Sequence, residues 1–95
     1  MKFFIGYDQS RKYVHDYCTK NLSIEFEKIG SSVLSENIWY RKRKPTDSTE
    51  FSVCRFLVPY LSKFEGWSVF MDDDFVWKVS PTELEQYCDD SYSVL

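Results

Sequence analysis

The chain has 95 residues, of which 43% are hydrophobic and 19% aromatic, and its net charge is −3. This length predicts a single domain, spanning 1–95, with a small core rich in aromatic side chains. The mild acidity gives no general attraction to nucleic acid, and no apolar stretch approaches the roughly 18 residues of a membrane span. The 3 cysteines are widely spaced, so we expect no disulfide framework, no zinc site and a cytoplasmic location.

The first half of the chain predicts a strand, a helix and a second strand. The apolar run KFFIGY at 2–7 is typical of a buried strand that ends in a loop. From Ser10, residues spaced by three or four predict a helix that ends at Gly30. Residues 31–40 predict a short second strand, and the charged segment 41–50, which contains a proline, predicts a loop.

The second half continues the alternation of helices and strands. Hydrophobic residues on one face predict a helix over 51–61, and the apolar run at 67–71 predicts a strand. Serine, proline and glutamate at the start of 80–88 predict a short helix, and 91–95 is typical of the start of a last strand. Strands that alternate with helices predict an α/β fold with a mostly parallel sheet flanked by helices.

Three consecutive aspartates follow the strand at 67–71. Side chains alternate in extended backbone, so Asp72 and Asp74 should point one way and Asp73 the other. Adjacent carboxylates repel one another unless a cation lies among them, and Mg²⁺ or Mn²⁺ prefers such oxygen ligands. In parallel sheets ligands bind beyond the carboxyl ends of the strands, where Asp8 should meet these aspartates. The alternative is an acidic, solvated turn without a ligand.

Several other charged or polar groups have two interpretations each. Arg55 lies in the apolar helix, so we expect it to be partly buried against either a carboxylate or a phosphate. The basic run at 41–44 could grip phosphates or be a solubilising loop, and we expect no nucleic-acid footprint from it. His15 is expected to be exposed or at the edge of the core, and Cys54 to belong to the core.

The blocks IGYD (5–8), STEFSVCRFLVPYL (48–61) and GWSVFMDDDF (66–75), followed by a short helix, resemble the nucleotide-sugar-binding half of GT-A glycosyltransferases. The likeness is to bacterial and viral proteins related to family 8 enzymes, and it covers about residues 3–95. It implies a Rossmann-like GT-A nucleotide-diphospho-sugar transferase fold in a truncated version. The later histidine that often completes the metal site of such enzymes has no assigned counterpart here.

The resemblance implies roles for particular residues. Asp72 and Asp74 match the DxD motif, so they are expected to hold Mn²⁺, or Mg²⁺, against the donor diphosphate and to be catalytic. Arg55 matches a catalytic helix arginine that approaches the donor phosphate or sugar. Tyr7 and Asp8 match the end of the first strand, which holds the uracil and ribose.

The same resemblance implies a lesser role for three more residues. Ser48 and Thr49 lie in the second block and are expected to line the sugar pocket. Asp73 belongs to the nucleotide-sugar site, although relatives often carry a cysteine or a small residue at this position.

The function implied is that of a Mn²⁺-dependent glycosyltransferase. It would bind a UDP-sugar, with UDP-glucose favoured, and transfer the sugar to an unknown acceptor with retention, or slowly hydrolyse the donor. The alternative is a non-catalytic nucleotide-sugar-binding module that has lost the acceptor half. A structural protein that binds a divalent cation is a third possibility, but it leaves Asp8 and Arg55 unexplained. An exposed sheet edge also predicts a homodimer.

Overall fold

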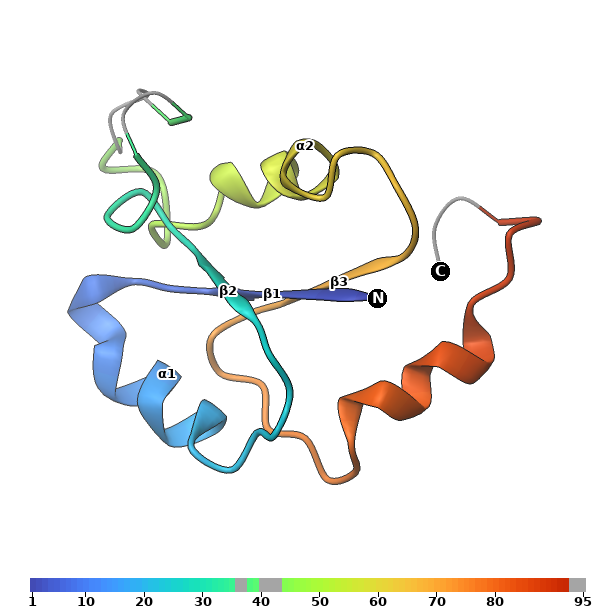
Figure 1. Cartoon of the computed structure of the whole chain (residues 1–95). Helices are drawn as coiled ribbons and strands as arrows, with labels where there is room; N and C mark the ends of the chain where they lie inside the picture. The colour runs from blue at the N-terminus through green and yellow to red at the C-terminus, as the bar shows by residue number, and fades with distance from the viewer. Residues whose placement is uncertain (36–37, 40–43, 93–95) are drawn as a thin grey trace.

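Three parallel strands form the sheet of this chain in the computed structural model. The structure describes residues 1–35, 38–39 and 44–92. The strands are β1 (Lys2–Gly6), β2 (Glu27–Ile29) and β3 (Ser68–Met71). β1 lies in the centre of the order β2-β1-β3 (Figure 1). The expected α/β class with a parallel sheet is therefore confirmed. No helix in the described ranges is long and apolar enough to cross a membrane.

The strand register places the ends of β1 and β3 together. Ile5 of β1 is opposite Lys28 of β2 and Met71 of β3, and both pairings are parallel. The residues that follow Gly6 and Met71 therefore leave the sheet at the same edge. Asp8 and the three aspartates therefore lie beyond the same edge of the sheet, and the charge of Asp8 raises the pKa of Asp73.

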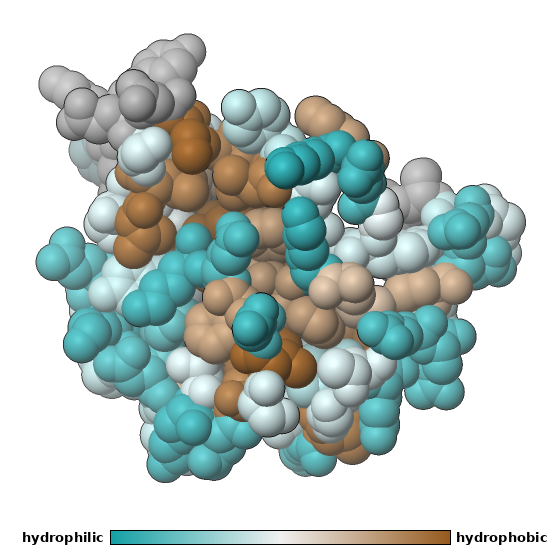
Figure 2. Space-filling view, in the orientation of Figure 1, coloured by the Kyte–Doolittle hydropathy of each residue, from teal (hydrophilic) through white to brown (hydrophobic). Residues whose placement is uncertain are grey.

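Helices and loops cover both faces of the sheet, as alternation of side chains along β1 requires. On one face Phe4 packs with Ile29, Phe51 and Cys54, beneath η2 (Cys54–Leu57) and α2 (Val58–Leu61). On the other face Phe3, Ile5 and Met71 form a second cluster, on the side of α1 (Lys12–Thr19). Figure 1 shows α2 above the sheet and α1 below it. Figure 2 shows hydrophobic side chains in the upper and central parts of this view, with hydrophilic ones around them.

The first helix is much shorter than expected. It consists of the 3-10 helix η1 (Gln9–Arg11) and α1, and it is over by Lys20 instead of continuing to Gly30. Leu22, Ile24 and Phe26 are partly buried against the second core cluster, and the residues between them are exposed. This period of two is that of extended backbone, so the spacing from Tyr17 to Ile24 was helical only by coincidence.

The second strand in the described part of the chain is β2, and the described residues of 31–40 form no strand. Residues 31–33 form a turn after Gly30, and the backbone N–H of Val33 and that of Leu34 both donate to the Gly30 carbonyl. The remainder of the predicted strand includes 36–37 and 40, which lie outside the described residues.

The two later helices are also shorter or tighter than expected. The helix predicted over 51–61 consists of η2 and α2, with a proline in the first turn of α2. That proline has no N–H to donate, so one regular helix cannot run through it. The helix at 80–88 is the 3-10 helix η3 (Pro81–Tyr87), and the Ser80 hydroxyl contacts Thr82 instead of capping the backbone.

Two predicted features fall on residues that the structure does not describe. The last strand at 91–95 includes 93–95, and the basic run at 41–44 includes 41–43. Ser91 and Tyr92 are described, and they belong to a turn and an irregular segment. The predicted strand at 67–71 is confirmed as β3.

Candidate functional site

The three aspartates after β3 alternate in exposure, and Asp73 and Asp74 lie in a turn and not in the extended backbone that was expected. Asp72 is exposed, and 64% of the Asp74 side chain is exposed. The Asp73 side chain between them is only 1% exposed. Two carboxylates at the strand exit therefore face solvent, and the one between them is buried.

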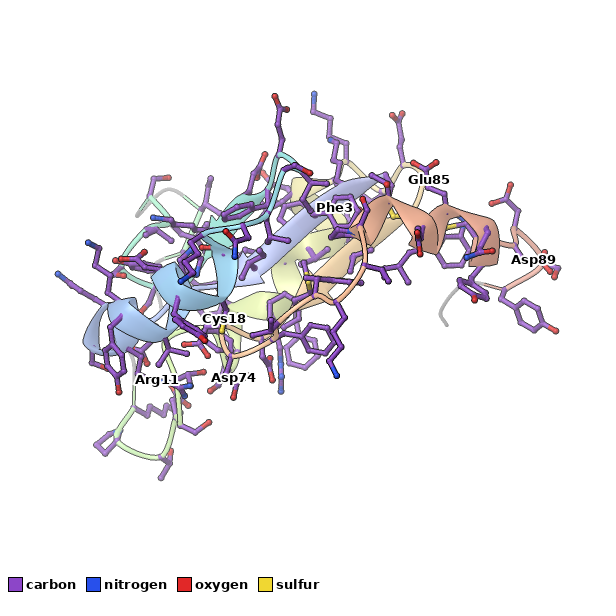
Figure 3. The ribbon with its side chains drawn as sticks, turned by 90° about the horizontal axis from the view of Figure 1, so that it is seen from below. Phe3, Arg11, Cys18, Asp74, Glu85 and Asp89 are labelled. Atoms are coloured by element: carbon purple, nitrogen blue, oxygen red, sulfur yellow. The ribbon has the colours of Figure 1, made fainter. Side chains whose placement is uncertain are left out.

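Arg11, which follows β1, pairs with this acidic turn at the same edge of the sheet. Its Nη2 atom lies 3.1 Å from Oδ1 of Asp73 and 3.9 Å from Oδ2 of Asp74. Arg11 ends η1, and Figure 3 shows it beside Asp74 at one end of the molecule. Sequence analysis missed this residue. The signal was a cation soon after β1, because parallel pairing brings the exit of β1 beside the exit of β3.

Burial raises the pKa of Asp73, and the negative charges of Asp74, Asp8 and Asp72 raise it further. Arg11 acts in the opposite direction and lowers the same pKa. The Oδ2 atom of Asp73 is buried and has no hydrogen-bond partner among the described residues. Asp73 is therefore a buried carboxyl group that Arg11 satisfies on one oxygen only.

Asp8 is buried and holds the end of β1 in place. Its Oδ1 atom accepts hydrogen bonds from the backbone N–H of Ser10 at 3.0 Å and from the Ser10 hydroxyl at 2.6 Å. Its Oδ2 atom accepts from the backbone N–H of Glu50 at 3.3 Å. Asp8 thus caps η1 and ties it to a segment 42 residues away. Its expected role at the ribose stays a prediction.

Tyr7, the residue expected to hold uracil, is also buried. The Lys28 ammonium lies 4.7 Å from the centre of its ring, and the His15 ring meets it edge to face at 5.2 Å. His15 itself is 1% exposed, deeper than expected, and its Nδ1 lies 3.2 Å from the Gly6 carbonyl oxygen. In this conformation these aromatic rings support the end of β1, and the role of Tyr7 toward uracil stays a prediction.

The segment 48–52 lies at the same edge of the sheet. One Glu50 oxygen accepts from the Gln9 backbone N–H at 2.8 Å and from the Ser32 hydroxyl at 2.9 Å. Beside it, the hydroxyls of Ser48 and Thr49 both contact the hydroxyl of Ser52, at 3.0 and 2.8 Å. The neighbouring Glu50 thus ties this segment to the residues after β1, and the role of Ser48 and Thr49 in a sugar pocket stays a prediction.

Arg55 is exposed, so the expectation of a partly buried arginine is wrong. Its guanidinium lies 5.6 Å from the centre of the Phe56 ring, and the ion pairs of the described residues do not include it. The apolar periodicity was misleading here, because η2 is a 3-10 helix and distributes its residues over faces differently from an α-helix. The role of Arg55 toward a donor stays a prediction.

Two hollows on the described part of the chain are large enough for a ligand. A groove of about 890 Å³ runs along β3 and is lined by residues that include Met1, Trp67 and Tyr87, away from the acidic turn. A smaller cavity of about 410 Å³ lies between the end of α1 and residues 76–81, and Cys18, Lys20 and Lys78 line it. Burial raises the pKa of Cys18, and so do the charges of Asp74 and Asp73. The smaller cavity therefore adjoins the acidic turn.

A divalent cation fits this edge only as a two-carboxylate site. No group of three or more His, Cys, Asp or Glu side chains in the described part of the chain could hold a metal ion. Asp72 and Asp74 offer two exposed carboxylates. A hard cation that takes its other ligands from water or from phosphate oxygens suits such a pair.

These features define a small α/β domain whose three-stranded parallel sheet ends in an acidic edge. The chain is similar to a protein of Arabidopsis thaliana called Protein CDI, with 36% identity over 101 aligned residues. The alignment covers 99% of this chain and 39% of that relative, so the chain spans about two fifths of the relative's length. No family model matches the chain, and no solved structure matches it.

Proposed function

We propose that this chain binds a UDP-sugar together with Mn²⁺ at the carboxyl edge of its sheet and transfers the sugar. The observation that carries the proposal is the pair of exposed carboxylates, Asp72 and Asp74, at the exit of β3 next to the exit of β1. The sequence blocks that resemble GT-A glycosyltransferases support the choice of ligand, and UDP-glucose is the favoured donor. The acceptor stays open.

In this proposal Asp72 and Asp74 hold the cation. Bound there, Mn²⁺ or Mg²⁺ would stabilise the negative charge that a diphosphate gains as it leaves the sugar. The chain adds positive side chains around the same edge, because Arg11 touches the acidic turn and Lys20 and Lys78 line the adjoining cavity. Cationic groups that are already in place where charge develops lower the barrier to transfer.

The cavity between α1 and residues 76–81 is large enough to take part of the donor. Its volume of about 410 Å³ lies within the range of roughly 300 to 1,000 Å³ that is usual for small-molecule sites. Ser48 and Thr49 lie at the same edge, and the exposed guanidinium of Arg55 is open to an anionic ligand. Because Tyr7 and Asp8 are buried, direct contact with uridine needs the loop after β1 to open.

The test is calorimetric titration of UDP and of UDP-glucose into the protein, first with Mn²⁺ and then with EDTA. We expect binding only with Mn²⁺, and we expect Asp74→Ala to abolish it without unfolding the protein, because Asp74 is an exposed side chain. Glu85→Ala is the matched control, since it removes an exposed carboxylate at the other end of the molecule (Figure 3). Full Mn²⁺-dependent affinity in Asp74→Ala would refute the assignment.

Turnover distinguishes the transferase from a binding module. Release of glucose from UDP-glucose, or its transfer to an added acceptor, supports the enzyme. Tight Mn²⁺-dependent binding with no product after long incubation supports the non-catalytic alternative. Sedimentation at high protein concentration tests the expected homodimer separately, and a monomer throughout would exclude it.

A further inference from the structure

Arg11 lies between a buried and an exposed carboxylate of the same turn. Its Nη2 atom is 3.1 Å from Asp73, whose side chain is 1% exposed, and 3.9 Å from Asp74, whose side chain is 64% exposed. The Arg11 side chain is itself 37% exposed, so part of it is accessible to a ligand. The pair with Asp74 is the weaker one, because exposed ion pairs contribute little.

The charges around Arg11 are unbalanced. Asp72, Asp73 and Asp74 carry three potential negative charges, and buried Asp8 also acts on Asp73. Asp73 keeps one buried oxygen for which the described residues supply no hydrogen-bond donor. Among the described residues, the ion pairs of Asp73 and Asp74 are both with Arg11. The negative charge of the acidic turn therefore exceeds the positive charge that is paired with it.

A divalent cation held by Asp74 would meet the Arg11 guanidinium across that carboxylate. Two positive charges a few ångströms apart near a protein surface repel each other, and water screens them less there than in bulk. A diphosphate that binds with the cation reverses this effect, because it presents negative charge to which the guanidinium can turn. The same arginine therefore opposes the metal alone and favours the metal with its anionic ligand.

We propose that Arg11 sets the order of binding at this edge. It keeps a divalent cation weakly bound on its own, and it releases Asp74 to contact the phosphates when a nucleoside diphosphate arrives with the cation. This inference rests on the proposed function for the identity of the anion. The repulsion between Arg11 and the cation does not depend on that identity.

The test compares Arg11→Gln with wild type in two titrations, Mn²⁺ alone and then UDP at saturating Mn²⁺. We expect Arg11→Gln to bind Mn²⁺ alone about five- to tenfold more tightly, since a repulsion of about 1 kcal/mol is removed. We expect it to bind UDP about tenfold more weakly, because one charged phosphate contact is lost. Arg11→Lys keeps the charge and should stay close to wild type for Mn²⁺ alone.

A second pair of variants separates the effect of Arg11 on binding from its effect on folding. Removal of Arg11 leaves Asp73 buried without its cation, so the same comparison is made between Asp73→Asn and the double variant Arg11→Gln/Asp73→Asn. A purely structural Arg11 would lower both affinities together, and weaker or unchanged Mn²⁺ binding in both comparisons would overturn the inference. If wild type fails to bind UDP at any Mn²⁺ concentration, the proposed function and the phosphate contact fall together. Tighter Mn²⁺ binding without Arg11 would still establish the repulsion in that case.

Discussion

Gly30 lies against the carbonyl group of Tyr7 so closely that a Cβ atom on residue 30 would collide with the carbonyl oxygen. The same stretch of chain carries a hydrogen bond of 2.7 Å from the Tyr7 backbone N–H to the Ile29 carbonyl. The obstacle is backbone and cannot turn away as a flexible side chain could. The close approach of the ends of β1 and β2 therefore requires glycine at this position.

Gly30→Ala should accordingly lower the free energy of unfolding by about 3 kcal/mol, because β1 and β2 must separate to admit the methyl group. Urea unfolding followed by tryptophan fluorescence measures this loss. Gly66→Ala is the control, since its φ of +67° is strained for alanine but nothing lies within 4 Å of the new Cβ. The control should lose only about 1 kcal/mol. Equal losses in the two variants would contradict the role given to the contact with Tyr7.

His15 should behave as a packing residue and not as a metal ligand. It is buried between Tyr7 and Phe26, and its Nδ1 atom faces the Gly6 carbonyl oxygen, so this nitrogen donates the hydrogen bond. His15→Ala should destabilise the protein by roughly 2 to 3 kcal/mol in urea unfolding. His15→Asn should restore part of that loss, because its amide can donate from nearly the same place. Mn²⁺ affinity should be the same in His15→Asn as in wild type, and a large fall would make His15 part of the metal site.

Cys54 should be unreactive in the folded protein. Burial raises the pKa of its thiol from about 9.0 to about 11, and its Sγ atom donates to the Glu50 carbonyl at 3.2 Å. Iodoacetamide at pH 8 should modify Cys54 only after urea is added, whereas partly exposed Cys88 should react in the native state. Peptide mapping by mass spectrometry distinguishes the two sites.

The same pKa predicts a dependence of stability on pH. The folded-state pKa is raised, so the stability that the buried thiol contributes is complete below about pH 9.0 and is lost as the pH rises toward about 11. The difference in unfolding free energy between wild type and Cys54→Ala should therefore be constant below pH 9 and shrink by roughly 2 kcal/mol by pH 11. A difference that stays constant over this range would show that Cys54 ionises as easily as in the unfolded chain.

Asp8 should prove important for stability whether or not it contacts a ligand. Asp8→Ala removes the cap of η1 and the bond to the Glu50 backbone N–H, and should cost about 2 kcal/mol in urea unfolding. Asp8→Asn keeps an acceptor oxygen toward Ser10 and should cost less. If Asp8→Asn folds well and loses Mn²⁺-dependent UDP binding, the carboxylate contacts the ligand. If it folds well and binds normally, Asp8 acts only on the fold.

Local patterns were sufficient for the strands that build the candidate site. The apolar runs that became β1 and β3 are short, nearly continuous and followed at once by acidic residues, which leaves little choice of structure. The sequence also predicted that Asp73 differs from Asp72 and Asp74, although the structure places Asp73 and Asp74 in a turn and not in extended backbone. The stretch 22–26 was misjudged, because two hydrophobic residues seven positions apart satisfy a helical period even where the residues around them alternate.

The sequence by itself determined the parallel α/β class and the presence of carboxylates beyond two strands, because both depend on periods of a few residues. Only the tertiary structure decided which cation meets those carboxylates. Arg11 and Asp73 are far apart in the chain, and parallel pairing of β1 with β3 brings them to 3.1 Å. The exposure of Arg55 was likewise decided by packing, since a short 3-10 helix turns its residues away from the face that an α-helix would bury.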